Sequence, residues 1–385
     1  MDEKIVAESQ SRIERIEGSL RPLTSIGDEG EGLSLSAHLT ERMSDLKVPG
    51  VGVTVVEDFE PAWSRSYGVR EVDSEDRVTH TTPFEIGSTT KLVTAIAALQ
   101  LVEQGKIGLD DDANDVLVNW KIPDSHSTVD EKVTLRRLLN HTSGIPATNF
   151  GWDDGTTPTL KQVLCGAAPA RNEKVEVATT PGRDHAYSNL GYVVIQQMVE
   201  DVIGKPFQEL IQHSLLEPLG MSHSAFDLPG LNDPVCHPHD GEGAAHPISL
   251  HPSALAQGGL LSTPEDLAKL AMDLMNGSEG RNSQLLRTNT IQCMMQPDPE
   301  LDIAKWSGFT DGQGLGLFLL GRGKEMKFLA PGLNLPGATG LIIAWPSRGF
   351  AVTLTTNALN GQMLQIEILN SIANEYGFDW GFQMG

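Results

Sequence analysis

The sequence predicts an α/β (α+β) fold, in which an antiparallel sheet is formed by both chain ends and flanked by helices, with a mostly helical domain inserted. Near the start, the β-branched run Val51 to Val56 and a second strand at residues 62–69 form a candidate hairpin. From Phe84 to about residue 300, apolar residues follow helical spacing, and loops with Gly and Pro separate the segments. Strands return late, at residues 314–320, 326–329, 338–345 and 350–356. Strands at both ends with helices between them indicate one sheet completed by the two ends of the chain.

The segments at the two ends frame this sheet. Residues 4–22 carry apolar positions at roughly helical spacing, and GDEGEG at 27–32 has the composition of a flexible acidic linker. A helix from Leu33 through Leu46 is expected to end at Pro49-Gly50. Between the last two strands PSRG predicts a turn, and a closing helix follows at 362–376.

Five further helices are predicted in the middle of the chain, at residues 92–104, 134–140, 189–203, 206–214 and 264–276. We therefore predict an N-terminal extension (1–32), a sheet domain (33–84 plus 305–385) and a helical domain (85–304). Ligand pockets are common between domains, so we expect the active site in the cleft between these two.

Composition narrows the class of protein. The 385 residues carry a net charge of −23, which argues against nucleic acid or an anionic membrane as a partner, because both need a positive surface. No apolar run is long enough for a transmembrane helix, and the polar start MDEK lacks the apolar region of a secretory signal. Cys165, Cys236 and Cys293 are odd in number and far apart, as expected of reduced thiols. We expect a cytoplasmic protein.

Ser88 and Lys91 lie three residues apart at the predicted start of a helix, so their side chains should share one face. A serine hydroxyl becomes a good nucleophile when a base takes its proton, and a lysine can be that base if desolvation lowers the pKa of its ammonium group. The helix N-terminus also favours negative charge on a bound carbonyl oxygen. By itself this spacing also occurs by chance on solvated helices.

A second candidate element is Tyr187-Ser188-Asn189, on a loop that precedes a helix. Tyr187 could act as a general base if a neighbouring lysine stabilises its anion, and Asn189 could hold a substrate carbonyl or that lysine. In isolation, packing for Tyr187 and helix capping for Ser188 or Asn189 explain the same residues.

Together these stretches resemble the serine β-lactamase and penicillin-binding-protein superfamily, in its class C-like esterase and transesterase branch. FEIGSTTK (84–91) contains the S-x-x-K pattern, and YSN (187–189) follows about a hundred residues later. Further stretches similar to the family are LLNHTSGIP (138–146), EPLGM (217–221), GGLLSTPEDL (258–267) and GLGL (314–317). The resemblance runs from about residue 34 to about 375 and implies a β-lactamase/transpeptidase-like fold.

The resemblance also implies a mechanism without a cofactor or a metal. Ser88 would attack a carbonyl while Lys91 and Tyr187 share the proton transfers, and an acyl-enzyme would form. The oxyanion donors implied by position are the backbone N–H of Ser88 and that of Leu333, next to Gly332 on a late strand. His141, in the motif at 138–146, is interpreted as structural.

One position departs from the family pattern. Related proteins carry Lys-Thr-Gly or His-x-Gly on this strand, whereas here FLAPGLNLPG (328–337) places Ala330 at the basic position. A cation there would bind a substrate carboxylate and lower the pKa of Tyr187. Its absence argues against a β-lactam or a peptide with a free carboxylate as the substrate. Lys327 is near in sequence, but strand alternation does not tell whether it faces the cleft.

Four histidines, at positions 237, 239, 246 and 251, follow or lie near Cys236. Their spacing matches no common zinc pattern, so we interpret the segment as a loop lining the cleft, with His251 or its neighbours facing the substrate. His185, two residues before Tyr187, is interpreted as a support of that loop.

The sequence thus predicts an acyl-enzyme-forming serine hydrolase or an acyltransferase of the transesterase kind. Its partner would be a small-molecule ester, lactone or acyl thioester, with an acyl carrier among the donors considered. This transesterase kind resembles β-lactamase-like enzymes of secondary metabolism that acylate polyketides. The alternative, motivated by Ala330, is a scaffold repurposed for binding or for chemistry other than acyl transfer.

Overall fold

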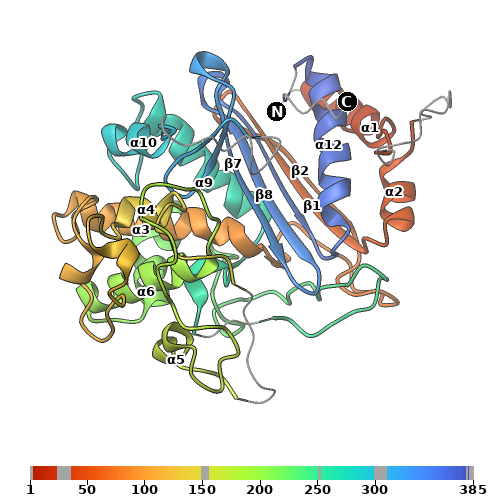
Figure 1. The fold of residues 1–385 in the computed structure, drawn as a ribbon. Coiled ribbons are helices and arrows are strands. Elements are labelled where there is room, and N and C mark those ends of the chain that lie inside the picture. Colours follow the sequence, from red (N-terminus) through yellow and green to blue (C-terminus); the bar gives the residue numbers. More distant parts are fainter. Residues whose placement is uncertain are drawn as a thin grey trace, which may run out of the picture.

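The computed structural model describes residues 3–23, 36–148, 156–249, 253–298, 310–378 and 380 of the chain. Its main element is a seven-stranded sheet with the order β2-β1-β9-β8-β7-β6-β5, in which neighbouring strands pair antiparallel. Its strands are β1 (Gly50–Glu57), β2 (Glu60–Gly68), β5 (Gly312–Gln313), β6 (Phe318–Leu320), β7 (Lys327–Asn334), β8 (Ala338–Trp345) and β9 (Phe350–Thr356). Strands from both ends of the chain share one sheet, so the predicted fold class is confirmed (Figure 1).

Helices cover the sheet on both sides. On one side lie α1 (Glu3–Glu17), α2 (Leu39–Asp45) and α12 (Gly361–Tyr376) (Figure 1). The remaining helices are α3 (Thr90–Glu103), α4 (Leu135–Leu139), α5 (Leu160–Cys165), α6 (Asn189–Ile203), α7 (Phe207–Ile211), α8 (Glu217–Leu219), α9 (Pro264–Ser278) and α10 (Thr288–Met294). The predicted helix at 206–214 is α7 followed by a π-helical turn, Gln212–Leu216. Among the described residues, no helix is long and apolar enough to span a bilayer.

Side chains of β1 alternate between the two covered faces. Val51, Val53 and Val55 belong to the buried cluster that includes α12, whereas Gly52 lies against Pro264 at the start of α9. This alternation follows from the two-residue period of a strand, and since both faces are buried, no charged residue occurs between Val51 and Val56. α9 falls within the range predicted as the helical domain, yet it packs on β1, β8 and β9. The division into two domains stays a prediction.

The helix predicted at 4–22 is present as α1 and packs on the sheet layer. Ile13, Ile16 and Leu20 are buried in the same cluster as α12, and Arg15 pairs with Glu375 on that helix. This part of the predicted N-terminal extension therefore contributes to the core. The predicted linker at 27–32 lies outside the described residues.

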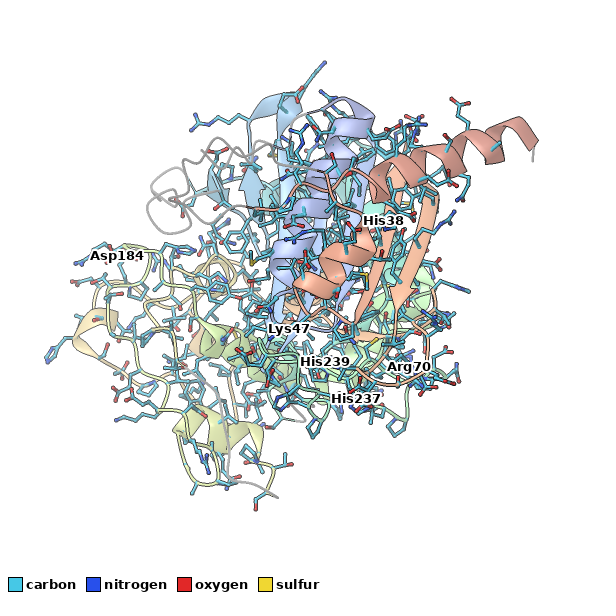
Figure 2. The ribbon with its side chains drawn as sticks, turned by 90° about the vertical axis from the view of Figure 1, so that its right-hand side faces the viewer. His38, Lys47, Arg70, Asp184, His237 and His239 are labelled. Carbon is cyan, nitrogen blue, oxygen red and sulfur yellow. The ribbon has the colours of Figure 1, made fainter. Side chains whose placement is uncertain are left out.

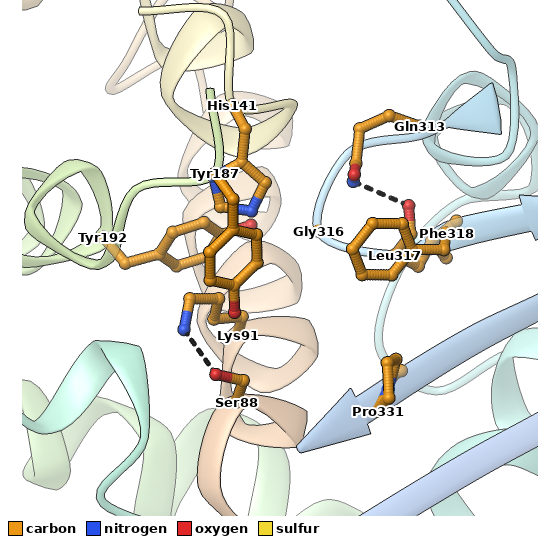
Figure 3. Close-up of a pocket in the computed structure, with 11 residues that line it drawn as sticks. Ser88, Lys91, His141, Tyr187, Tyr192, Gln313, Gly316, Leu317, Phe318 and Pro331 are labelled. Carbon is orange, nitrogen blue, oxygen red and sulfur yellow. Dashed lines mark hydrogen bonds between the residues drawn. The ribbon is translucent and has the colours of Figure 1, made fainter. Parts of the chain in front are cut away.

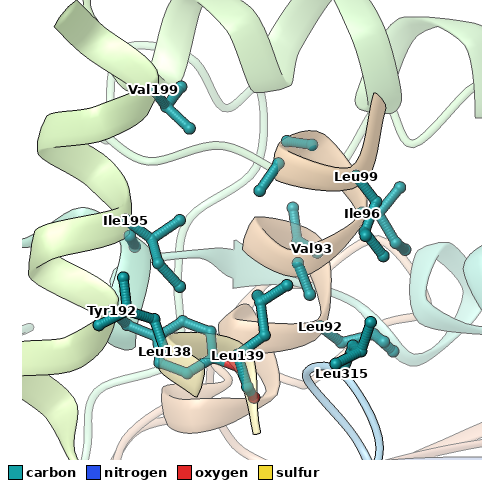
Figure 4. Close-up of a cluster of buried hydrophobic side chains, with 14 of the residues drawn as sticks. Leu92, Val93, Ile96, Leu99, Leu138, Leu139, Tyr192, Ile195, Val199 and Leu315 are labelled. Atoms are coloured by element: carbon teal, nitrogen blue, oxygen red, sulfur yellow. The ribbon is translucent and has the colours of Figure 1, made fainter. Parts of the chain in front are cut away.

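α3 is the central helix of the part of the molecule that faces the other side of the sheet. Its residues from Thr90 to Leu99 are all buried, which is expected of a helix surrounded by other elements. Figure 4 shows Val93 and Ile96 of α3 among side chains of α4 and α6, such as Leu138 and Ile195. The helix that starts behind Ser88 is thus held rigidly.

The late strands differ from the prediction in two places. The expected strand at 314–320 is instead β5 and β6 joined by a turn, because Gly316 has a φ of +84° and Gly314 N–H donates to the Leu317 carbonyl at 2.9 Å. The expected strand at 326–329 continues to Asn334. Pro331 argued against this extension, because proline is not expected within a paired strand. Beyond Leu329, however, β7 no longer pairs with β6, and proline is tolerated at such an edge.

Candidate active site

Ser88 lies in a tight 3₁₀ turn, Gly87–Thr89, between the short strand β3 (Phe84–Glu85) and α3. β3 pairs with β4 (Leu261–Ser262), which fixes the entry to the turn. Gly87 has a φ of +51°, and a Cβ there would lie 2.5 Å from the Leu333 carbonyl carbon. The glycine before the serine is therefore required by both the turn and the close approach of β7.

β7 lies directly against the same turn. A Cβ on Gly332 would lie 1.9 Å from the Ile86 carbonyl oxygen and 2.6 Å from Thr89 N. The Thr89 hydroxyl donates to the Ala330 carbonyl at 3.0 Å. The nucleophile turn and β7 are thus in direct backbone contact, which is possible only with glycine at position 332.

Lys91 meets Ser88 as the spacing in the sequence predicts. Its Nζ atom lies 2.9 Å from Ser88 Oγ and 2.6 Å from the Gln257 carbonyl oxygen, and the residue is 3% exposed. In the part of the chain that the structure describes, no carboxylate pairs with this amine. Burial lowers the pKa of Lys91 well below its usual value, so the site favours the uncharged amine that a base requires.

Tyr187 is the second side chain beside Ser88, so that Ser88, Lys91 and Tyr187 form a group of three (Figure 3). The Lys91 Nζ atom lies 5.0 Å from the centre of its ring, and its hydroxyl hydrogen bonds with Ser88. Burial raises the pKa of Tyr187 to about 12, and the hydrogen bond with Ser88 opposes this rise. The phenol is therefore protonated at neutral pH, which favours Lys91 over a tyrosine anion as the first base.

His141 lies behind Tyr187, with their ring centroids 4.3 Å apart. Its backbone φ is +62°, as at a sharp turn, and its Nδ1 atom accepts the Ser188 N–H at 3.2 Å. Burial lowers the pKa of His141 well below its usual value. The residue supports a turn, as expected, but its ring also lines the pocket, and no sequence pattern indicated this second role.

The described residues that line the pocket come from the region of α3 to α6 and from the region of β5 to β7 (Figure 3): Ser88, Lys91, His141, Tyr187, Tyr192, Gln313, Gly316, Leu317, Phe318, Ala330 and Pro331. Sequence reasoning missed Tyr192, Gln313 and Phe318. Tyr192 donates to the Leu139 carbonyl at 3.0 Å, and Gln313 hydrogen bonds with His185. The only signal for Gln313 was its place directly before the GLGL motif, whereas Tyr192 and Phe318 carry no local signal.

Three residues predicted for the site lie beside this pocket without lining it. Asn189 is the first residue of α6, and its buried Oδ1 atom has no hydrogen-bond partner within the described parts of the chain. No hydrogen bond joins it to Lys91 in these parts. Gly332 and Leu333 lie against the turn around Ser88, as described above, and their role as oxyanion donors stays a prediction.

The wall formed by β7 carries no cation among the described residues. Ala330 lines the pocket, whereas Lys327 belongs to the opposite face of the strand, where its Nζ atom lies 4.2 Å from the centre of the Trp345 indole. Lys327 therefore does not replace the missing basic residue. Leu317, Phe318 and Pro331 make this side of the pocket mainly apolar.

The histidines at 237, 239 and 246 do not line the pocket. His239 is buried and linked to two backbone segments, with Nδ1 2.8 Å from the Asn357 oxygen and Nε2 accepting the Val72 N–H at 3.0 Å. In Figure 2, His237 and His239 lie near Arg70, whose carbonyl accepts the His237 N–H. Within the described residues, no group of three His, Cys, Asp or Glu side chains could hold a metal ion. His251 lies outside the described residues.

The fold and this arrangement of serine, lysine and tyrosine are typical of the β-lactamase-like class of proteins. The sequence model of the family described as Beta-lactamase matches residues 35–371, so the chain belongs to this family.

Two curated proteins are similar to this chain in sequence. The chain is 28% identical over 179 residues to Protein flp of Staphylococcus aureus (strain N315), covering 46% of this chain and 35% of that protein. It is 27% identical over 251 residues to the Unguisins hydrolase ungD of Aspergillus violaceofuscus, covering 60% of this chain and 42% of that protein. The chain thus spans less than half the length of these curated relatives.

Two solved structures share the fold. The octameric penicillin-binding protein homologue from Pyrococcus abyssi has a TM-score of 0.73 and 28% identity, over 89% of this chain and 76% of that chain. EstCE1, described as a hydrolase with promiscuous acyltransferase activity, has a TM-score of 0.74 and 19% identity, over 95% of this chain and 99% of that chain. The second likeness shows the fold alone.

Proposed function

We propose that this protein is an acyl-enzyme-forming serine hydrolase or acyltransferase acting on an uncharged ester, lactone or thioester of a small-molecule metabolite. The observation that carries the proposal is the contact of Ser88 Oγ with both the buried amine of Lys91 and the hydroxyl of Tyr187. An uncharged amine beside a serine hydroxyl is the arrangement needed to remove its proton.

In the acylation step, Ser88 Oγ attacks the substrate carbonyl carbon and its proton passes to Lys91 Nζ. The negative charge that develops on the carbonyl oxygen is stabilised by the N–H groups of Ser88 and Leu333. The bond to the leaving alcohol or thiol then breaks, and Tyr187 donates the proton that this group needs, with Lys91 restoring the tyrosine proton. An ester or thioester gives the acyl-enzyme and a released alcohol or thiol, whereas a lactone gives an acyl-enzyme that carries the new hydroxyl group.

In the deacylation step, water or an acceptor alcohol attacks the acyl carbon and gives its proton to the same pair of side chains. The bond to Ser88 Oγ breaks, and the serine regains its proton. Hydrolysis and transfer therefore differ only in the nucleophile of this second step, and an acyl carrier is included among the donors that we propose.

The apolar wall of the pocket supports an uncharged substrate. Ala330 leaves no cation on the pocket side of β7 to bind a carboxylate, because Lys327 of this strand contacts Trp345 instead. A desolvated carboxylate needs a charged or hydrogen-bonding partner, so a β-lactam with a free carboxylate is a poor substrate for this site. The net charge of −23 supports a small-molecule partner rather than nucleic acid or an anionic membrane, and we propose a cytoplasmic enzyme.

Intact-protein mass spectrometry with a fluorophosphonate and a panel of activated esters and thioesters tests this function. We expect one adduct on Ser88 that is absent in Ser88→Ala and present in Ser44→Ala, which changes an exposed serine of α2. The added mass from the panel identifies the preferred acyl group. A folded wild-type protein that forms no adduct with any reagent would favour the alternative of a binding scaffold.

A further inference from the structure

The backbone segment that accepts the hydrogen bond of Lys91 is itself held by side chains of two elements, α3 and β7. Three consecutive carbonyl groups accept hydrogen bonds: Ala256 O from the Thr94 hydroxyl at 2.7 Å, Gln257 O from Lys91 Nζ at 2.6 Å, and Gly258 O from Asn334 Nδ2 at 3.3 Å. The Leu260 N–H donates to the Thr90 hydroxyl at 3.2 Å. The position of the amine of Lys91 is therefore set by this segment as well as by α3.

Glu85 is the buried carboxylate that joins this segment to β7. It is 1% exposed and lies three residues before Ser88. Its Oε2 atom accepts a hydrogen bond from Asn334 Nδ2 at 3.0 Å, and its Oε1 atom accepts the Ser249 N–H at 2.6 Å. Because Asn334 Nδ2 also donates to Gly258 O, one amide bridges Glu85 and the segment that binds Lys91.

These contacts close a ring that contains the catalytic pair. From Glu85 the ring runs along the chain to Ser88, through Lys91 to Gln257, along the backbone to Gly258, and through Asn334 back to Glu85. Asn334 also follows Leu333, whose backbone lies against Gly87. A shift of the Asn334 amide would therefore move both the support of Lys91 and the end of β7.

Stability alone does not explain the carboxylate at this position. No cation among the described residues shifts the titration of Glu85, and its hydrogen-bond donors are neutral amides. A buried carboxylate without a counter-charge costs folding free energy, and burial raises the pKa of Glu85 to about 7. A group that is costly to bury and is tied to the catalytic turn is a candidate for a role in function.

We propose that Glu85 and Asn334 are positioning residues of the acylation step, which hold the Gln257–Gly258 backbone and the end of β7 so that the Lys91 amine is aligned on Ser88 Oγ. The proposal rests on the proposed function of Ser88 and Lys91. The carboxylate accepts one N–H of the Asn334 amide and so orients it toward Gly258 O. A neutral amide at position 85 has only one oxygen for the two N–H donors of Asn334 and Ser249, so its N–H2 group would face one of these donors and that hydrogen bond of the network would be lost.

The test compares Glu85→Gln, Asn334→Ala and the double variant with Asp273→Asn. Asp273 is a matched control, since it is 7% exposed and also accepts one side-chain and one backbone donor, Ser283 Oγ and Gln284 N–H, both at 2.7 Å. The readout is the rate of adduct formation on Ser88 by an activated ester, measured against ester concentration.

We expect both single variants to lose up to about 100-fold in the limiting acylation rate, with the half-saturating ester concentration unchanged, because a small misplacement of a catalytic group has an effect of this size. The double variant should be no slower than the slower single variant, whereas Asp273→Asn should lose stability but acylate like the wild type. Wild-type acylation rates in folded Glu85→Gln and Asn334→Ala would overturn the inference while leaving the proposed function intact. A wild-type protein without a Ser88 adduct would instead overturn the proposed function.

Discussion

The amine of Lys91 lies 2.6 Å from the carbonyl oxygen of Gln257, a residue more than 160 positions later in the chain. The carbonyl accepts one N–H of the amine, and Ser88 Oγ lies 2.9 Å from the same nitrogen. Two fixed partners orient the nitrogen, so that its lone pair can meet the serine proton. The base is therefore positioned by a segment remote in sequence.

Replacement of Lys91 tests its role as the base that takes the proton of Ser88. Lys91→Ala and Lys91→Arg should both lower the acylation rate of Ser88 by about 100-fold to 10,000-fold, because alanine supplies no base and arginine remains protonated. The rate of fluorophosphonate adduct formation on Ser88 provides the measurement. Lys174→Arg, at an exposed site, is the control and should react like the wild type. Full activity of Lys91→Arg would show that the lysine is not the base.

Ala330 offers a direct test of substrate charge. Ala330→Lys should increase kcat/KM for esters whose acyl group carries a free carboxylate, relative to neutral esters of the same size, because the new ammonium would stand in the pocket wall. Ala330→Met has a side chain of similar length without the charge and should not change this ratio. An equal effect of the two substitutions would mean that the position acts through size alone.

The titration of Glu85 predicts a pH dependence of stability. Its pKa is raised from 4.5 to about 7 in the folded protein, so the native state binds the proton more tightly than the unfolded state. The stabilising contribution of the protonated carboxyl is therefore complete below about pH 4.5 and is lost as the pH rises to about 7, by up to about 3 kcal/mol.

Denaturant unfolding of the wild type and of Glu85→Gln between pH 4.5 and 8 would measure this contribution as a difference. The free energy of unfolding of the wild type should fall relative to that of the variant across this range, since glutamine does not titrate. A difference that stays constant with pH would contradict the buried, shifted carboxyl.

Much of the fold could be predicted because local patterns determine it. The run Val51 to Val56 carries no charged residue and is mostly β-branched, and it is a strand buried on both faces. The extension of β7 through Pro331 could not be predicted, because it depends on the place where β6 stops pairing. The split of the strand expected at 314–320 likewise depends on the backbone of Gly316, which packs against Ala95 of α3.

The same distinction applies to the site. Ser88 and Lys91 meet because three residues on a helical turn place them together, so their contact follows from spacing. Glu85, Gln257 and Asn334 meet through tertiary packing alone. The direction of Lys327 was open for a related reason: either face of β7 was compatible with the sequence, and the contact with Trp345 decides it.

Gly332 provides a test of the close contact between β7 and the nucleophile turn. In Gly332→Ala the new Cβ would lie 1.9 Å from the Ile86 carbonyl oxygen and 2.6 Å from Thr89 N, both backbone atoms, so that the strand or the turn must move. We expect the limiting rate of Ser88 acylation to fall. The rate is measured on folded protein, so that a loss of stability does not contribute to it. Gly241→Ala is the control, because its Cβ would meet only side-chain atoms at 3.6 Å and 3.9 Å, which are ordinary contacts. Since the backbone at 332 also precedes the predicted oxyanion donor Leu333, a Gly332→Ala protein that acylates normally would show that β7 does not have to lie this close for the reaction.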